Sequence, residues 1–569
     1  MNRILTTTLF GACIAATSVY AQQRPDRAAQ PPSTSREDAL DPTPVNPATD
    51  PNLDMFINDW RNAKPRTMFG KLVYHDILTP LGPADPVKPV KRGAVLTGIN
   101  TVSYVTLDPG AAAGGRANKG QRQIFLATGG AGKLTVNGKS YDVKDGIGFT
   151  VTPEFDFKLT STGKAPLSFY VRQESIPASA KAEPNVVVVN RFDNDRRVGA
   201  HWVHTCNGGP SGMSLCTIAP FTMPQPHSHP GEEAWIMVKG ESILSLGKEI
   251  RRMTPGQAYR IPPTGVAAHS NLNLTEEPIE MIYMGPADRT VDQAWVAARP
   301  GKLANMDYAR LDNSPLNPAG DPDADMFIGN WHDAYPQVKH GNMYWRDMLT
   351  ALQGPDSLHP TRKGAVLTNA TAVSYAMLEP GSTAHKADGE FKGVQETYVV
   401  HSGTGSITVG GKTVELSKDK AFILTPGMDF KITSTGPSYL TFYVVSEKIP
   451  DGATPKTTLE VTDNGARPQT TSNWFNKERP LITKADGLVQ YRAVTEVELK
   501  SMAMSRPYSA AKDVEEIWIA TDGDIDMLFG KQLRKLPAGT AYRIPSTGIT
   551  AQAKINVSGK PAKFLSMVK

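Results

Sequence analysis

The chain repeats itself, and this duplication constrains its fold more than any other feature. Residues 50–60 read DPNLDMFINDW, and residues 321–331 read DPDADMFIGNW. Three further segments recur in the same order: 92–97 (RGAVLT) at 363–368 (KGAVLT), 160–163 (TSTG) at 433–436, and 258–262 (AYRIP) at 541–545. One unit of roughly 250 residues therefore occurs twice, which predicts two halves of similar fold.

Each half also contains two similar modules. Residues 134–153 and residues 244–263 both read as a hairpin with a glycine turn, a second glycine turn and a strand that ends at proline. Short strands at this spacing, without long helices between them, favour antiparallel sheets. We therefore expect an all-β protein with four small antiparallel jelly-roll β-barrels, arranged as two repeats with short flanking helices, one near Met55 to Trp60.

The repeats and the composition predict how the 569 residues are divided. The predicted segments are a signal peptide (1–21), a flexible leader (22–50), barrels at 51–180 and 181–291, a linker with a short helical stretch (292–320), and barrels at 321–452 and 453–569.

The N-terminus predicts export. A positive start at Met1-Asn2-Arg3 precedes an apolar or small stretch over 4–16 and a small-residue cleavage site at 19–21, as in a secretory signal peptide. A membrane anchor would need a longer and less threonine-rich run, and a lipoprotein reading would use Cys13. We expect a periplasmic or secreted protein with no membrane attachment after signal cleavage.

Charge and cysteine content narrow the choice of partners. Lys plus Arg total 61 and Asp plus Glu total 56, without a basic block, so we expect no nucleic-acid partner. Signal cleavage would leave Cys206 and Cys216, which flank a turn sequence at 207–212. In an oxidising compartment these two thiols could form a disulfide; the alternative is two buried free thiols.

Histidines cluster in the second module, where 5 of the 11 lie between residues 201 and 269. His227 and His229 are two residues apart, so on a strand both imidazoles point to one face. Glu233 begins the next strand, and His269 can come from a neighbouring one. Three imidazoles and one carboxylate suit a divalent first-row metal with an open coordination position. The alternative is a set of histidines on a polar surface strand.

Segment 227–240 resembles the first motif of the cupin superfamily, and residues 256–273 resemble the second. The resemblance implies a jelly-roll barrel that holds one metal ion. Its ligands would be four side chains: His227, His229, Glu233 and His269. One departure is Phe221, which stands where the first motif has glycine. The metal could be Mn, Fe, Ni, Cu or Zn, because ligand type does not choose among them.

The other three modules lack this ligand set. Two of them keep the glutamate, at Glu396 and Glu516, and the first has Gln123 at that position. Counting back from Glu516 puts Ala510 and Lys512 at the two histidine positions. We therefore expect one divalent transition metal per chain, bound in the second barrel.

Three further residues are candidates for catalysis. His201 and His204 have no histidine counterpart in the last module, so either could transfer a proton or bind substrate; surface exposure is the alternative. Arg260 could pair with a substrate carboxylate, although its counterpart Arg543 in a module without the metal motif favours a structural role.

These patterns predict an exported metal-dependent enzyme that acts on a small polar organic molecule. The superfamily that this sequence resembles includes dioxygenases, decarboxylases, isomerases and hydrolases. Among these reactions we expect that of an oxidoreductase or a lyase. The alternative is a non-catalytic protein that binds a carbohydrate or other small molecule, or an assembly protein, with a structural metal. Pairing through barrel faces would give a homo-oligomer.

Overall fold

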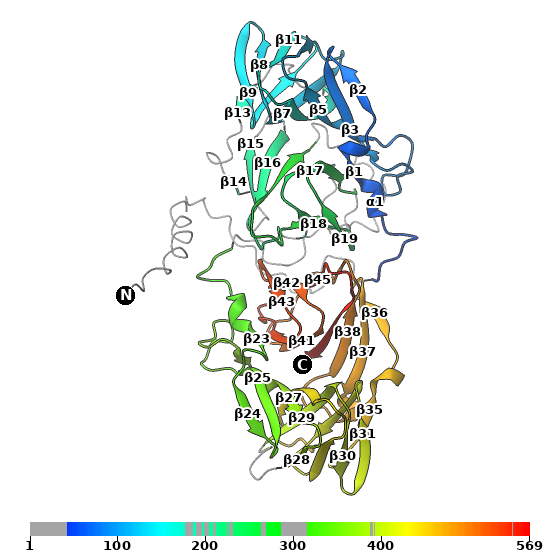
Figure 1. Ribbon diagram of the computed structural model, residues 1–569, viewed down its shortest axis with the longest axis vertical. Coiled ribbons are helices and arrows are strands. Elements are labelled where there is room, and N and C mark those ends of the chain that lie inside the picture. The colour runs from blue at the N-terminus through cyan, green and yellow to red at the C-terminus, as the bar shows by residue number, and fades with distance from the viewer. Residues whose placement is uncertain are drawn as a thin grey trace, which may run out of the picture. The chain divides into compact units, whose positions relative to one another are not determined.

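The computed structural model describes most of the chain from residue 43 onward. The described ranges are 43–176, 186–188, 196–197, 204–208, 212–224, 226, 232–262, 269–285, 316–386, 391, 393–548 and 550–569, with the backbone alone given for 187–188, 196–197 and 204–208. This part is an all-β protein with eight sheets, which form four barrels of two sheets each (Figure 1). The predicted fold class is confirmed.

Barrel 1 is the pair of sheets that follows the first helix in the chain. Its larger sheet has the order β13 (Val186–Val188), β10 (Ile147–Val151), β7 (Gln121–Gly129), β12 (Leu167–Ser175), β5 (Ile99–Leu107), β3 (Leu72–Pro80) and β2 (Pro65–Met68), with β4 (Ala94–Leu96) paired to β3. Its smaller sheet has the order β6 (Ala112–Gly115), β11 (Phe157–Ser161), β8 (Ala131–Val136) and β9 (Lys139–Lys144).

Barrel 2 comes next in the chain. Its larger sheet has the order β1 (Ile57–Asp59), β20 (Gln257–Arg260), β17 (Ala234–Lys239), β22 (Ile279–Met284), β16 (Met213–Ile218), β15 (His204–Gly208) and β14 (Arg196–Arg197). Its smaller sheet has the order β19 (Glu249–Met253), β18 (Ser242–Leu246) and β21 (His269–Leu272).

Barrel 3 has the same strand arrangement as barrel 1. Its larger sheet has the order β24 (Pro336–Lys339), β25 (Met343–Ala351), β27 (Ala370–Leu378), β34 (Leu440–Lys448), β29 (Val394–Ser402), β32 (Lys420–Leu424) and β35 (Val461–Asp463), with β26 (Ala365–Leu367) paired to β25. Its smaller sheet has the order β28 (Thr383–His385), β33 (Phe430–Ser434), β30 (Gly405–Val409) and β31 (Lys412–Leu416).

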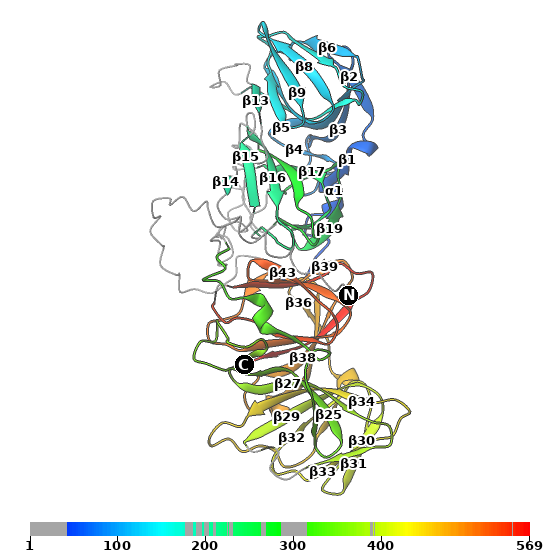
Figure 2. The same ribbon diagram turned by 60° about the vertical axis from the view of Figure 1, so that its left-hand side comes forward.

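Barrel 4 repeats the arrangement of barrel 2. Its larger sheet has the order β23 (Ile328–Asn330), β44 (Thr540–Arg543), β41 (Glu516–Asp522), β46 (Ala562–Val568), β38 (Ala493–Leu499), β37 (Asn476–Thr483) and β36 (Thr470–Ser472). Its smaller sheet has the order β39 (Ala503–Met504), β45 (Ala551–Asn556), β42 (Ile525–Phe529) and β43 (Gln532–Leu536), with β40 (Tyr508–Ser509) paired to β45. Figure 2 shows the strands of this barrel beside those of barrel 3.

Strands cross between the two barrels of a repeat. The segment expected to be a helix near Met55 to Trp60 is helical over α1 (Leu53–Phe56) and then extends as β1. Extension is favoured because β1 pairs with β20 of barrel 2, with Ile57 opposite Tyr259. The second repeat does the same, since β23 pairs with β44. Conversely, β13, which follows the predicted end of barrel 1 in the sequence, pairs with β10 of barrel 1. The exact domain boundaries stay predictions.

Short 3-10 helices and the end of the predicted leader complete the described chain. The helices are η1 (Trp60–Asn62), η3 (Ala324–Phe327), η4 (Asn464–Ala466) and η5 (Lys484–Asp486). Within the leader, the N–H of Val45 donates to the carbonyl of Trp474 at 3.3 Å, and the ammonium of Lys248 donates to Thr43 at 2.8 Å. No helix in the described ranges is long and apolar enough to span a membrane.

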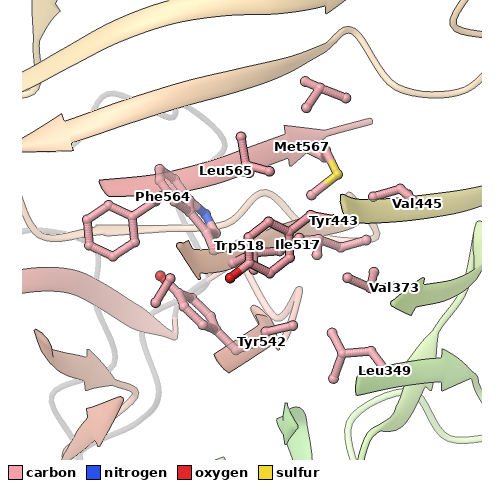
Figure 3. Packing of buried hydrophobic residues seen from close by; sticks show 14 of the residues in the cluster. Leu349, Val373, Tyr443, Val445, Ile517, Trp518, Tyr542, Phe564, Leu565 and Met567 are labelled. Carbon is pink, nitrogen blue, oxygen red and sulfur yellow. The ribbon is translucent and has the colours of Figure 1, made fainter. Parts of the chain in front are cut away.

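The barrels of each repeat share one hydrophobic core. In the second repeat, Leu349, Val373 and Tyr443 of barrel 3 pack with Trp518 and Leu565 of barrel 4, and all five are buried (Figure 3). Burying side chains from both barrels removes apolar surface from water and stabilises the pair as one body.

A second shared core joins the two repeats. It contains buried side chains of barrel 2 and barrel 4, among them Met223, Ile243, Leu272, Met504, Leu528 and Leu533. A bridge pairs Thr222 with Gln532, and the N–H of Leu533 donates to the carbonyl of Phe221 at 3.0 Å. Phe221, expected to be glycine, has φ of 49°, the left-handed conformation that explains why glycine suits this position.

A disulfide lies at the hairpin of β15 and β16. Cys216 is disulfide-bonded, and the strand register places Cys206 directly opposite it. Of the two alternatives for these cysteines, the structure therefore supports cross-linking.

Candidate metal site

Two of the four predicted metal ligands lie in the described part of barrel 2, and the structure brings them together. Glu233 precedes β17, His269 begins β21, and both are buried at 9% and 3% exposure. Glu233 Oε1 and His269 Nε2 are 3.7 Å apart, although 36 positions separate them in the sequence. His227 and His229 lie outside the described residues, so the full ligand set stays a prediction.

The strand pairing explains how His269 reaches Glu233. In the smaller sheet, His269 pairs with Leu246 of β18, and the alternation of a strand gives His269 and Asn271 the same face. Asn271 Nδ2 donates to the hydroxyl of Tyr259 at 2.6 Å. Burial raises the pKa of Tyr259 well above its usual value, so this hydroxyl keeps its proton.

Glu233 is oriented from its own strand. The indole N–H of Trp235 donates to Glu233 Oε1 at 2.5 Å, and Trp235 is itself buried. A donor fixed by packing holds the carboxylate in one orientation. Trp235 therefore positions a carboxylate that would otherwise rotate.

This geometry fits a shared metal ion. Protein ligands lie about 2.0–2.2 Å from such an ion, so two atoms that share it lie less than about 4.4 Å apart. The separation of 3.7 Å between Glu233 and His269 meets this condition. Among the described residues, no three His, Cys, Asp or Glu side chains are grouped to hold a metal.

Arg260, a catalytic candidate, points into the interface between barrels 1 and 2. Its guanidinium Nη2 donates to Thr97 at 3.2 Å, and its Nε lies 3.9 Å from Glu232 Oε1. Glu232 also accepts backbone N–H groups of residues 97–99. These contacts account for Arg260 without a substrate and support its structural role.

The structure leaves the other two catalytic candidates as predictions. His204 lies on β15, where the described backbone pairs it with Ile218, and its side chain lies outside the described part. His201 lies outside the described residues altogether.

Barrel 3 contains an imidazole that the sequence did not suggest. The buried His340 Nε2 is 3.0 Å from Glu396 Oε2, and the hydroxyl of Tyr398 donates to the same oxygen at 2.7 Å. His340 comes 56 positions before Glu396, far from the histidine spacing of the motif. His340 has a φ of 52°, and the glycine that follows it, Gly341, is the sequence signal that could have marked this turn.

In barrels 1 and 4, the residue that corresponds to Glu233 also accepts a hydrogen bond from a side chain of the same barrel. In barrel 1, the hydroxyl of Tyr74 donates to Gln123 Oε1 at 2.7 Å. In barrel 4, the hydroxyl of Tyr508 donates to Glu516 at 2.5 Å. The register pairs Tyr508 with Gln552, so Tyr508, rather than Ala510, faces the glutamate.

Comparison with known proteins finds one matching family and several solved structures. The family described as "Cupin domain" matches residues 214–285. No curated protein matches the chain. Among solved structures, Bacillus subtilis oxalate decarboxylase is 13% identical and covers 43% of this chain and 77% of its own, with a TM-score of 0.33. AerE from Microcystis aeruginosa is also 13% identical, covers 40% and 97%, and has a TM-score of 0.32.

The Lactobacillus farciminis oxalate decarboxylase formate complex is 12% identical and covers 43% of this chain and 86% of its own, with a TM-score of 0.33. The matched residues 214–285 include Glu233 and His269, and they lie in a barrel of two antiparallel sheets. Barrel 2 of this chain therefore contains a segment that matches the cupin domain.

Proposed function

We propose that this protein is an exported metal-dependent cupin enzyme with one active site, in barrel 2, that acts on a small polar organic molecule. The ligands are His227, His229, Glu233 and His269. The observation that carries the proposal is the approach of Glu233 and His269 to 3.7 Å inside the segment that matches the cupin domain.

The other barrels support a single site. Their residues at the glutamate position already receive donors from the same barrel: Tyr74 in barrel 1, His340 and Tyr398 in barrel 3, and Tyr508 in barrel 4. The sequence places no His-x-His pair before the corresponding residue in these three barrels, so only barrel 2 offers the complete ligand set.

The bound metal would supply Lewis-acid or redox chemistry at an open coordination position. Around it, Trp235 holds the Glu233 carboxylate, while Tyr259 and Asn271 form a hydrogen-bonded pair that keeps Asn271 fixed beside His269. These buried groups exclude water from the inner side of the site.

The chain would be periplasmic or secreted after removal of residues 1–21, with a small-molecule substrate, no nucleic-acid partner and no membrane attachment. Oxidoreductase or lyase chemistry suits a cupin metal site best. Association through barrel faces would give a homo-oligomer.

Metal analysis of the purified protein tests the proposal. We expect about one divalent transition metal per chain in the wild type and at least a tenfold loss of bound metal in His227→Ala. His385→Ala is the matched control, because His385 is exposed on β28 of barrel 3. Oxygen-consumption and decarboxylation assays on small organic acids would then identify the reaction.

A wild-type chain without metal, or a His227→Ala variant that retains it, would contradict the proposal. Ligand binding that survives removal of the metal by a chelator would instead favour the alternative, a non-catalytic protein that binds a carbohydrate or other small molecule.

A further inference from the structure

Barrel 4 contains a buried polar cluster at the place that corresponds to the metal site of barrel 2. Glu516 begins β41 as Glu233 precedes β17, and it is 4% exposed. Its Oε1 accepts three hydrogen bonds: from Tyr508 at 2.5 Å, from Trp518 Nε1 at 2.6 Å and from Gln552 Nε2 at 2.8 Å. The three donors come from β40, β41 and β45, so the carboxylate ties together both sheets of the barrel.

A lysine completes this cluster. Lys554 is 2% exposed, and its ammonium donates to Gln552 Oε1 at 2.8 Å. The same ammonium lies 3.2 Å from the centre of the Trp518 ring, within the range of a cation–π interaction. Glu516 and Glu478 are the carboxylates whose charges favour its protonated form.

The internal duplication identifies the residue of barrel 2 that corresponds to Lys554. His269 pairs with Leu246, and Gln552 pairs with Phe529 at the same place in the sheet of barrel 4. Two residues further along each strand come Asn271 and Lys554. Barrel 2 therefore has a neutral amide where barrel 4 has a cation.

We propose that the ammonium group of Lys554 is a built-in cation that takes the place of a metal ion in barrel 4. A buried carboxylate requires a compensating charge or several donors. In barrel 4 the chain supplies both from its own side chains, whereas in barrel 2 the proposed metal ion would supply the charge. The proposal concerns barrel 4 and holds whether or not barrel 2 is catalytic.

The charge of Lys554 depends on pH. Burial lowers the pKa of Lys554 to about 7, so the ammonium is the main form below that pH. The groups that face it are Glu516, Glu478, Tyr508 and Trp518. The test below is therefore made at pH 6, where the built-in cation is present.

The first experiment measures the coupling between the two charges in the full chain by calorimetry at pH 6. Glu516→Gln leaves the ammonium without its carboxylate, so we expect Tm to fall by roughly 5 °C or more. In a Lys554→Met background the same substitution should change Tm by less than half as much. The matched control is Lys560→Met, an exposed lysine, in which Glu516→Gln should have its full effect.

An equal effect of Glu516→Gln in the wild type and in the Lys554→Met background would overturn the proposal.

The second experiment measures metal binding and does not depend on these stabilities. It combines Lys554→Asn, Gln552→His and Tyr508→His, which replaces the cation by the amide of barrel 2 and supplies two imidazoles beside Glu516.

We expect this triple variant, dialysed against Co²⁺, to bind one more metal per chain than the wild type measured beside it. The difference cancels whatever barrel 2 binds, so the result is independent of the proposed active site. A folded triple variant that binds no additional Co²⁺, although Lys554 has been removed, would count against the proposal.

Discussion

Corresponding side chains in the four barrels occupy the same position and differ in what they contact. Gln123 accepts from one tyrosine, Glu396 contacts an imidazole and a tyrosine, and Glu516 accepts from three donors. Glu233 lies near His269, with Trp235 as its donor. The residue type at this position is therefore not enough to predict a metal site, and its neighbours have to be considered with it.

Lys554 should make the stability of the folded protein depend on pH. Burial lowers its pKa from 10.5 to about 7 in the folded protein, so between these two values the unfolded chain binds a proton that the folded chain does not. Stability should therefore rise as the pH increases from 7 toward 10. Tyr508 opposes this trend only toward the top of the range: burial raises its pKa above the usual value of 10.0, so the unfolded chain begins to lose this proton before the folded chain does.

Urea unfolding at pH 7 and pH 9.5 would measure this effect. We expect a higher midpoint at pH 9.5 in the wild type and a smaller rise in Lys554→Met. The same rise in both proteins would mean that other groups cause the pH dependence.

At the scale of elements, a buried carboxylate joins the two barrels of each repeat. Glu232 accepts the N–H groups of residues 97, 98 and 99 at 2.7, 2.9 and 2.8 Å, where barrel 1 begins strand β5. Glu515 makes the same kind of contact with residues 368–370. Each carboxylate accepts hydrogen bonds from backbone N–H groups at the start of a strand, which buried backbone groups require.

Glu232→Ala should loosen the first repeat. The substitution leaves three N–H groups and Arg260 without this carboxylate, so we expect a loss of about 3 kcal/mol or more in the free energy of unfolding. Glu241→Ala is the control, because Glu241 pairs with Arg252 on the surface and should change stability by less than about 1 kcal/mol. A similar loss in both variants, measured by urea unfolding, would contradict this role.

The sequence predicted these elements where the signal was local. Glycine turns and strand alternation indicated four barrels, and Glu233 with His269 could be paired from motif spacing. His340 and Tyr508 were missed because their contacts with Glu396 and Glu516 depend on strand register and on turns that no spacing rule describes. The helix expected near Met55 to Trp60 is shorter than predicted. The pairing of β1 with β20, a strand almost 200 residues away, overrides the local pattern.

On the scale of the whole molecule, the two repeats meet through barrels 2 and 4. Strand β21 carries His269 toward the site, and its Leu272 belongs to the core shared with barrel 4. Likewise, β45 carries Lys554 inward and Ala553 into the same core. The contact between repeats thus supports the strand that holds a predicted metal ligand.

Cutting the chain within 286–315 should leave the two halves associated, because the shared core still buries apolar side chains from both. A variant with a protease site in this segment would be cleaved and passed over a size-exclusion column. We expect co-elution of the halves, and separation when Leu528→Asp places a charge in the shared core. Lys560→Asp, at an exposed position, is the control, and halves that separate without any core substitution would contradict the expectation.

The disulfide of Cys216 has a practical consequence for anyone who prepares this protein. The cross-linked hairpin carries His204 at one end of β15, two residues from Cys206. Material made in a reducing bacterial cytosol would lack this covalent tie, and its hairpin would be held by hydrogen bonds alone. Screening for activity should therefore begin with material folded under oxidising conditions.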